Sequence, residues 1–149
     1  MSVGDPHTQA GEARSIELRC GKLAPSEARR WLGWIDPYLG PIRFYDAQVM
    51  VSELVSNAVM HADLGAGDPI RLRARVEADR IRVSVCDNGR GFQPEDPPRR
   101  PPADVVGGLG LWLVDTLADR LTFDGPRGRV CFEVAREGDG AAQPGAPSS

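Results

Sequence analysis

The segment IRLRARVEADRIRVSVC, residues 70–86, decides the fold of this 149-residue chain. Apolar residues occupy alternate positions in two runs, 70–76 and 81–85, and arginines fill most of the positions between them. A period of two is typical of a strand with one buried face, and Ala78 and Asp79 can form the turn between two such strands. We therefore predict an antiparallel strand pair with an apolar core face and an arginine-rich outer face.

The outer face of this strand pair would carry Arg71, Arg73, Arg75 and Arg82. Charged side chains on a solvated sheet face are the ordinary explanation for such a row. A docking surface for an acidic partner is the alternative, and the sequence alone leaves it open.

Helices and further strands are expected before and after this strand pair in the sequence. The range 46–62 has apolar residues at helical spacing and no internal glycine or proline, so it predicts a long helix. An earlier helix should begin near Pro25 and be broken by Pro37, Gly40 and Pro41. The other expected elements are a helix at 109–117 and strands at 15–20, 121–123 and 130–134.

The two ends and one internal segment differ from the rest of the chain in composition. Residues 1–14 and 137–149 have little to bury, so we expect a disordered leader and tail around a single domain at 15–136. Closely spaced prolines between 92 and 107 exclude a helix or a central strand there and predict a loop.

Charge and composition exclude several classes of function. The formal net charge of −3 argues against direct nucleic-acid binding, which favours a basic surface. No stretch approaches the roughly 20 apolar residues of a membrane helix, and residues 1–14 lack the apolar core of a signal peptide, so we expect a cytoplasmic protein without membrane contact. Cys20, Cys86 and Cys131 are far apart and lack metal-ligand spacing, which predicts reduced and largely buried thiols.

Three polar motifs carry the candidate chemistry, and the first lies in the helix at 46–62. Glu53, Asn57 and His61 are spaced by four residues and so share one helix face. The row offers a carboxylate, an amide and an imidazole to a ligand. A solvated helix face would show the same pattern, so this motif alone decides little.

The second motif follows the strand at 81–85 and consists of Asp87, Gly89 and Gly91. Glycine permits close approach of backbone N–H groups to a ligand, and an aspartate at a strand end can accept hydrogen bonds from an exocyclic amine. An ordinary Asx or glycine turn is the alternative interpretation.

The third motif is Gly107-Gly108-Leu109-Gly110-Leu111, which stands immediately before a predicted helix. Exposed N–H groups at a helix start form an anion site suited to phosphates. A glycine-rich helix start is by itself weak evidence for such a site.

In this order, the three motifs resemble the N box and the two glycine boxes of the GHKL superfamily. That superfamily contains gyrase-type ATPases, Hsp90, sensor histidine kinases and anti-sigma-factor serine kinases. The similarity covers residues 15–136. It implies the Bergerat ATP-binding fold, an α+β two-layer sandwich in which a mixed, mostly antiparallel β-sheet packs on helices.

The resemblance also implies a role for each motif residue in binding ATP and Mg²⁺. Asn57 would coordinate the magnesium ion, Asp87 would hydrogen-bond the adenine amino group, and His61 would lie near the phosphates. The segment 92–107 would form the ATP lid. The two glycine boxes would bring the backbone against the nucleotide and cradle its phosphates through Gly89, Gly91, Gly108, Leu109, Gly110 and Leu111.

Glu53 indicates the type of reaction, because the resembling ATPases and serine kinases have a glutamate here that acts as a general base. The motif SELVSNAVMHA, residues 52–62, is most similar to the anti-sigma-factor kinase branch. That branch implies a protein serine/threonine kinase which binds a sigma factor and phosphorylates a small serine-bearing antagonist. A non-catalytic module that docks a regulatory partner, with or without nucleotide, is the alternative.

One departure and one open question accompany the resemblance. Related proteins often have Gly-Thr in the last strand, whereas this chain has Gly128 and Arg129 and so lacks the hydroxyl.

Homodimers are common in the resembling branch. Trp31, Trp34 and Tyr38 could supply a dimer contact or could equally pack into the core of their own domain.

Overall fold

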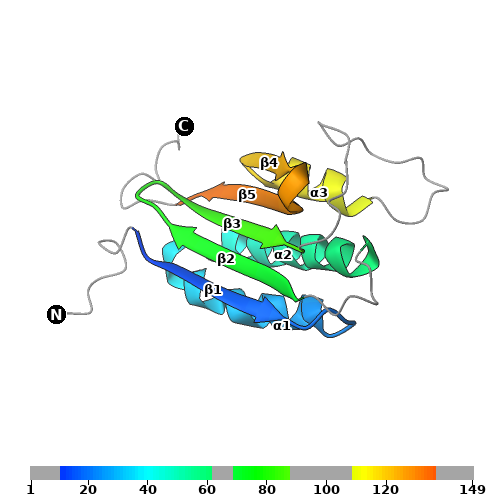
Figure 1. Cartoon of the computed structure of the whole chain (residues 1–149). Coiled ribbons are helices and arrows are strands. Elements are labelled where there is room, and N and C mark those ends of the chain that lie inside the picture. The colour runs from blue at the N-terminus through cyan, green and yellow to red at the C-terminus, as the bar shows by residue number, and fades with distance from the viewer. Residues whose placement is uncertain (1–10, 62–68, 88–108, 137–149) are drawn as a thin grey trace.

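Two layers make up the structure, a five-stranded sheet and the helices that cover one of its faces (Figure 1). The computed structural model describes residues 11–61, 69–87 and 109–136. The strands are β1 (Ala13–Leu18), β2 (Ile70–Val76), β3 (Arg80–Cys86), β4 (Arg120–Asp124) and β5 (Arg129–Ala135). The α-helices are α1 (Ala24–Trp31), α2 (Pro41–His61) and α3 (Leu109–Leu117), and the 3-10 helices are η2 (Leu32–Tyr38) and η3 (Gly125–Arg127).

The sheet has the strand order β1-β2-β3-β5-β4, and every neighbouring pair is antiparallel. The strand pair expected from the alternating sequence, β2 and β3, lies at its centre, with Ala74 opposite Val83. The predicted α+β two-layer fold is confirmed.

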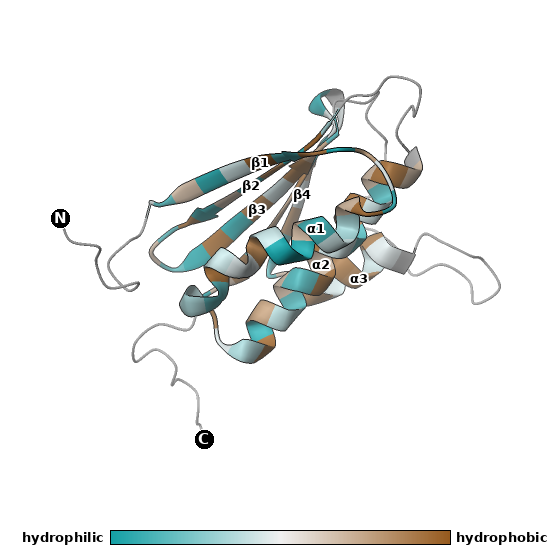
Figure 2. Cartoon of the chain, turned by 90° about the horizontal axis from the view of Figure 1, so that it is seen from below, coloured by the Kyte–Doolittle hydropathy of each residue, from teal (hydrophilic) through white to brown (hydrophobic). Residues whose placement is uncertain are grey.

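Alternation along each strand separates a buried inner face from an exposed outer face. In β2 the apolar residues are buried and the three arginines between them are exposed. Figure 2 shows this alternation as stripes of brown and teal along the strands, with α1, α2 and α3 gathered on one side of the sheet. Phe132 of β5, Met50 of α2 and Val114 of α3 are fully buried in the layer between.

Helix α2 begins at Pro41, five residues before the predicted range of 46–62, and Ala62 lies outside the described residues. The first helical stretch ends at Tyr38, before Gly40 and Pro41, as expected. Pro41 also opens α2, because proline lacks only an N–H that the first helical turn leaves unpaired. Pro37 lies inside the 3-10 helix η2, which follows α1 directly and ends one residue later at Tyr38.

The thiols and the aromatic side chains near α1 have defined places in the monomer. The three cysteines, all among the described residues, form no disulfide, and each is half-buried, so the prediction of largely buried thiols was too strong. Trp34 makes edge contacts with Trp31 and Tyr38, at ring distances of 6.5 and 6.4 Å. These aromatic residues therefore pack within their own domain. None of the described helices has the length and apolar character needed to cross a membrane.

Candidate functional site

The first and third motifs meet where helices α2 and α3 pack together. Gly110, in the first turn of α3, is buried against Glu53 of α2. A Cβ atom added at Gly110 would lie 2.6 Å from Oε1 and 3.4 Å from Cβ of Glu53. Real Cβ atoms do not approach an oxygen so closely, so only glycine allows this arrangement of the Glu53 side chain.

The position of Glu53 places a carboxylate beside the start of a helix. The first N–H groups of α3 have no carbonyl partner within the helix, and the helix dipole favours negative charge at this end. Glu53 would therefore lie beside any anion that these N–H groups hold. The arrangement suits a carboxylate that acts on an anionic group held at the same place.

Asn57 follows Glu53 by one turn of α2 and is half-buried like it. The neighbouring positions Leu54, Val55 and Ala58 are buried in the core, which fixes the rotation of the helix. The row from Glu53 to Asn57 therefore borders the core without entering it. Residue 61, the last of α2, continues the row in sequence, but the His61 side chain lies outside what the structure describes.

Asp87 comes directly after β3 and is 7% exposed. Its backbone N–H donates a hydrogen bond of 3.1 Å to the carbonyl of Gly128. Gly128 has φ of 63°, a left-handed conformation that favours glycine, and it ends the turn between β4 and β5. This turn therefore holds the strand end that carries the Asp87 carboxylate.

The three elements that carry these residues meet at one end of the molecule. Figure 1 shows the end of β3, the end of α2 and the start of α3 on the same side of the view. The packing of α2 on α3 brings Glu53 against Gly110, and the elements that carry Asn57 and Asp87 end on the same side of the molecule. Pairing of Glu53 with Gly110 was missed, because the sequence gives each residue a motif but not a neighbour.

Other predicted site residues lie at or beyond the edge of the described structure. Leu111 packs against the hydrophobic core as a partly buried residue. Leu109 opens α3, but its side chain is outside the described part. The remaining predicted positions, Gly89, Gly91, Gly108 and the proposed lid at 92–107, lie outside the described residues.

Metal binding through a cluster of acidic or imidazole side chains is not indicated here. The described residues contain no group of three His, Cys, Asp or Glu side chains that could hold an ion. Magnesium is commonly held by one or two protein oxygens together with phosphates and water. A single amide oxygen at Asn57, one helical turn from Glu53, is compatible with that mode of binding.

Comparison with known proteins identifies the family to which this chain is similar. Residues 10–135 match the family model described as a histidine kinase-like ATPase domain. A protein named serine-protein kinase RsbW from Listeria monocytogenes serovar 1/2a is 37% identical over 91 residues, which cover 53% of this chain and 58% of the relative. One of the same name from Bacillus licheniformis is 35% identical over 88 residues, covering 51% of this chain and 54% of the relative.

The solved structures include one of the RsbU and RsbW domains of Rv1364c from Mycobacterium tuberculosis. Its fold is similar to that of this chain with a TM-score of 0.59 and 19% sequence identity, over 83% of this chain and 31% of that one. This likeness concerns the fold. The chain spans somewhat more than half the length of the curated relatives it matches.

Proposed function

The chain belongs to the family of histidine kinase-like ATPase domains, and on that basis we propose that it binds ATP with magnesium and phosphorylates a serine of a partner protein. The observation that carries the proposal is the contact between Glu53 and Gly110. It joins the candidate base to the helix start that the family resemblance assigns to the phosphates. The names of the relatives, which are serine-protein kinases, support the same reaction.

Glu53 would act as the general base. A serine hydroxyl that attacks the γ-phosphate must lose its proton, and a carboxylate held beside the phosphates is placed to accept it. The start of α3 would at the same time hold phosphate oxygens through its free N–H groups. Glu53 would thus stand between the incoming hydroxyl and the group that is transferred.

Asp87 and Asn57 would place the nucleotide for that transfer. The carboxylate of Asp87, held by the turn at Gly128, would accept a hydrogen bond from the adenine amino group. Asn57 would offer its amide oxygen to magnesium, which neutralises phosphate charge when bound. Adenine at Asp87 and phosphates at α3 would fix the nucleotide at both ends.

The proposed partners follow from the branch that the sequence resembles. They are a sigma factor, held in one nucleotide state, and a small antagonist protein whose serine accepts the phosphate. Exchange between them would be a population shift set by nucleotide and phosphorylation. The match covers only somewhat more than half the length of the kinase relatives, so these partners belong to the proposal.

Calorimetry with ATP, with and without magnesium, tests the nucleotide site. The wild type should bind ATP more tightly with magnesium, and Asp87→Ala should lose most of this affinity. A matched control is Asp79→Ala, which removes an exposed aspartate from the turn between β2 and β3. Absence of ATP binding by the wild type would contradict the proposal.

Turnover separates the kinase from a non-catalytic module. Glu53→Gln keeps the size of the side chain but removes its basicity, so ADP formation from ATP should fall by about 10² or more, within the usual contribution of a general base. ATP affinity should change by no more than about threefold, because the amide retains the shape. Equal loss of affinity and turnover would show that Glu53 serves binding instead of proton transfer.

A further inference from the structure

The outer face of the sheet, which no helix covers in the described structure, carries side chains in rows that cross the strands. The register places Ser84 of β3 opposite Arg73 on one side and Cys131 on the other, and Cys131 opposite Thr122 of β4. Three of these four side chains are short. The side chains of this middle row therefore project only a short way from the sheet, except for that of Arg73.

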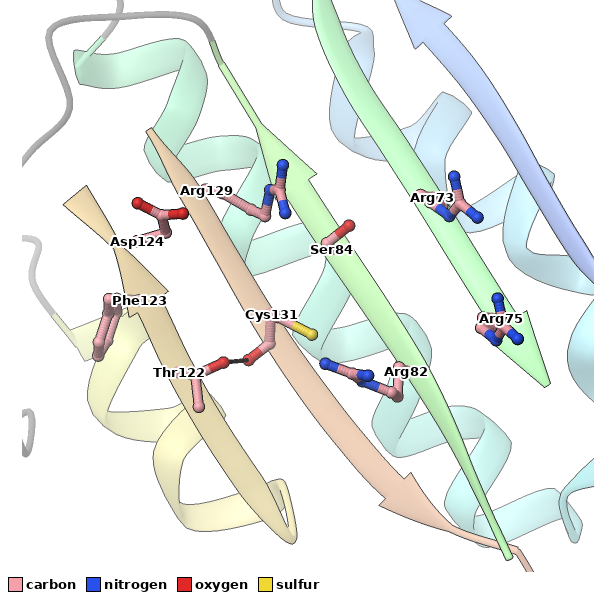
Figure 3. Close-up of a pocket in the computed structure, with 9 residues that line it drawn as sticks. All are labelled: Arg73, Arg75, Arg82, Ser84, Thr122, Phe123, Asp124, Arg129 and Cys131. Carbon is pink, nitrogen blue, oxygen red and sulfur yellow. Dashed lines mark hydrogen bonds between the residues drawn. The ribbon is translucent and has the colours of Figure 1, made fainter. Parts of the chain in front are cut away.

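Arginines stand around this low row. Arg75 and Arg82 form a cross-strand pair on one side of it, and Arg129 of β5 lies on the other side. Together with Arg73 they surround a hollow of about 350 Å³, as Figure 3 shows. Long side chains beside short ones thus produce the depression.

The hollow has a surplus of positive charge. Four guanidinium groups line it, against the single carboxylate of Asp124. The whole chain has a net charge of −3, so this local surplus does not reflect overall composition. A hollow with this charge favours an anionic ligand.

Two of the four arginines are already partly neutralised. Arg75 and Arg82 lie 3.8 and 3.6 Å from Glu77, and Arg82 lies 3.3 Å from Glu133. Within the described part of the chain, no acidic group lies within ion-pair distance of Arg73 or Arg129. These two guanidinium groups are free to bind a ligand.

The floor of the hollow adds neutral donors. Ser84 presents a hydroxyl group, and the thiol of Cys131 lies beside Arg82 (Figure 3). The Thr122 hydroxyl already donates to the carbonyl of Cys131 at 3.5 Å. Burial raises the pKa of the Cys131 thiol above its usual value, although Arg82 opposes the shift. The thiol is therefore neutral at physiological pH and does not occupy the site as an anion.

We propose that this hollow binds a small anion that carries two or more phosphate or carboxylate groups. Arg73 and Arg129 stand two strands and one row apart, so their Cα atoms are separated by roughly 12 Å from standard sheet spacing. A ligand with two linked charged groups can contact both guanidinium groups at once, without requiring either side chain to lean toward the other. The planar guanidinium fork binds phosphate and carboxylate alike through paired hydrogen bonds.

The surroundings of the hollow favour a compact ligand over an acidic polypeptide. Glu17, Glu77 and Glu133 lie on the same outer side, beyond the lining residues. An acidic segment long enough to cross the sheet would meet these carboxylates and be repelled. The site also lies on the face opposite α2 and α3, so it does not depend on the proposed kinase function.

Calorimetry with inorganic tripolyphosphate and with citrate tests the site at low and high salt. One binding event of each probe should be at least tenfold weaker in the double variant Arg73→Ala/Arg129→Ala, whereas tripolyphosphate held at the proposed phosphate site beside α3 should be unaffected. The matched control Arg19→Ala/Arg30→Ala removes two exposed arginines that do not line the hollow, and its affinity should stay within twofold of the wild type. Thermal unfolding of each variant checks that it is folded.

Alkylation of the cysteines locates the bound probe. The bound anion should slow the modification of Cys131 by iodoacetamide in the wild type, while Cys20, outside the hollow, reacts at an unchanged rate. Tighter binding of tripolyphosphate assigns the site to phosphates, and tighter binding of citrate assigns it to carboxylates. The proposal is overturned if neither probe binds, if the two double variants lose affinity equally, or if only a hexaglutamate peptide binds.

Discussion

The two faces of the sheet come from the same strands but have opposite roles. The inner face is apolar and buried under helices, two of which bring Glu53 against Gly110. The outer face carries arginines around a hollow and has no helix over it in the described structure. Because side chains alternate along a strand, one face can hold the fold together while the other face is free to bind.

Stability should depend far more on the inner face than on the outer one. Phe132→Ala removes a fully buried ring of β5 and leaves a cavity, so we expect the free energy of unfolding to fall by about 3–5 kcal/mol. Arg129→Ala, three residues earlier on the outer face, should change it by less than about 0.5 kcal/mol. Urea unfolding of both variants measures the difference, and similar losses would contradict the division between the faces.

The contact on the helix side can be broken without unfolding the domain. In Gly110→Ala the added methyl group would meet Oε1 of Glu53, the end of a flexible side chain that can turn away. ADP formation should therefore fall by at least tenfold, about 1.4 kcal/mol in activation free energy. The free energy of unfolding should change by less than about 1 kcal/mol, since alanine also favours the helix.

The control for this experiment is Gly33→Ala, because an added Cβ there has nothing within 4 Å. It should leave ADP formation unchanged. Full activity of the Gly110→Ala protein would show that the position of Glu53 beside α3 is not needed for turnover.

How well the sequence predicted each region depends on how local its determinants are. The two-residue alternation at 70–86 predicted β2, β3 and the outer face, and the limits of α3 at 109–117 were also correct. The contact of Glu53 with Gly110 could not be predicted, because it depends on how two helices separated by a long stretch of chain pack together. The start of α2 was missed because proline was interpreted only as a helix breaker.

The hollow on the outer face was predicted in part. The arginines of β2 and β3 were visible in the alternation, and a docking role was left open. The sequence marked Arg129 only as a departure from the usual threonine. Its place beside Arg73 follows from the order β2-β3-β5, which joins strands that are far apart in the sequence.

Ion pairs should also differ in strength between the two sides. On the helix side, Arg43 donates to Asp46 at 2.7 Å, to Asp119 at 2.9 Å and to the carbonyl of Leu117 at 3.3 Å. Arg43→Ala should therefore lower the free energy of unfolding by about 1–2 kcal/mol, because the mostly buried Asp46 carboxylate and the Leu117 carbonyl lose this donor. Thermal unfolding at neutral pH measures this loss.

The matched variant on the outer face is Arg71→Ala. Arg71 pairs with Glu17 at 3.0 Å, but both side chains are more than half exposed. Its loss should cost less than about 0.5 kcal/mol. An effect as large as that of Arg43→Ala would show that the outer face contributes to stability as well as to binding.

A dependence of stability on pH is expected at the turn between β2 and β3. The hydrogen bond from Arg80 lowers the pKa of Glu77 below its usual value, and Arg82 and Arg75 act in the same direction. A carboxylate whose pKa is lower in the folded state stabilises the fold above its unfolded pKa, and this stabilisation is lost as pH falls through the folded pKa. The wild type should therefore exceed Glu77→Gln in stability at pH 7 by less than about 1 kcal/mol, and the difference should shrink as the pH falls below the usual pKa of a glutamate. Urea unfolding of both proteins across this range tests the prediction, and a constant difference at every pH would mean that Glu77 acts through packing instead of charge.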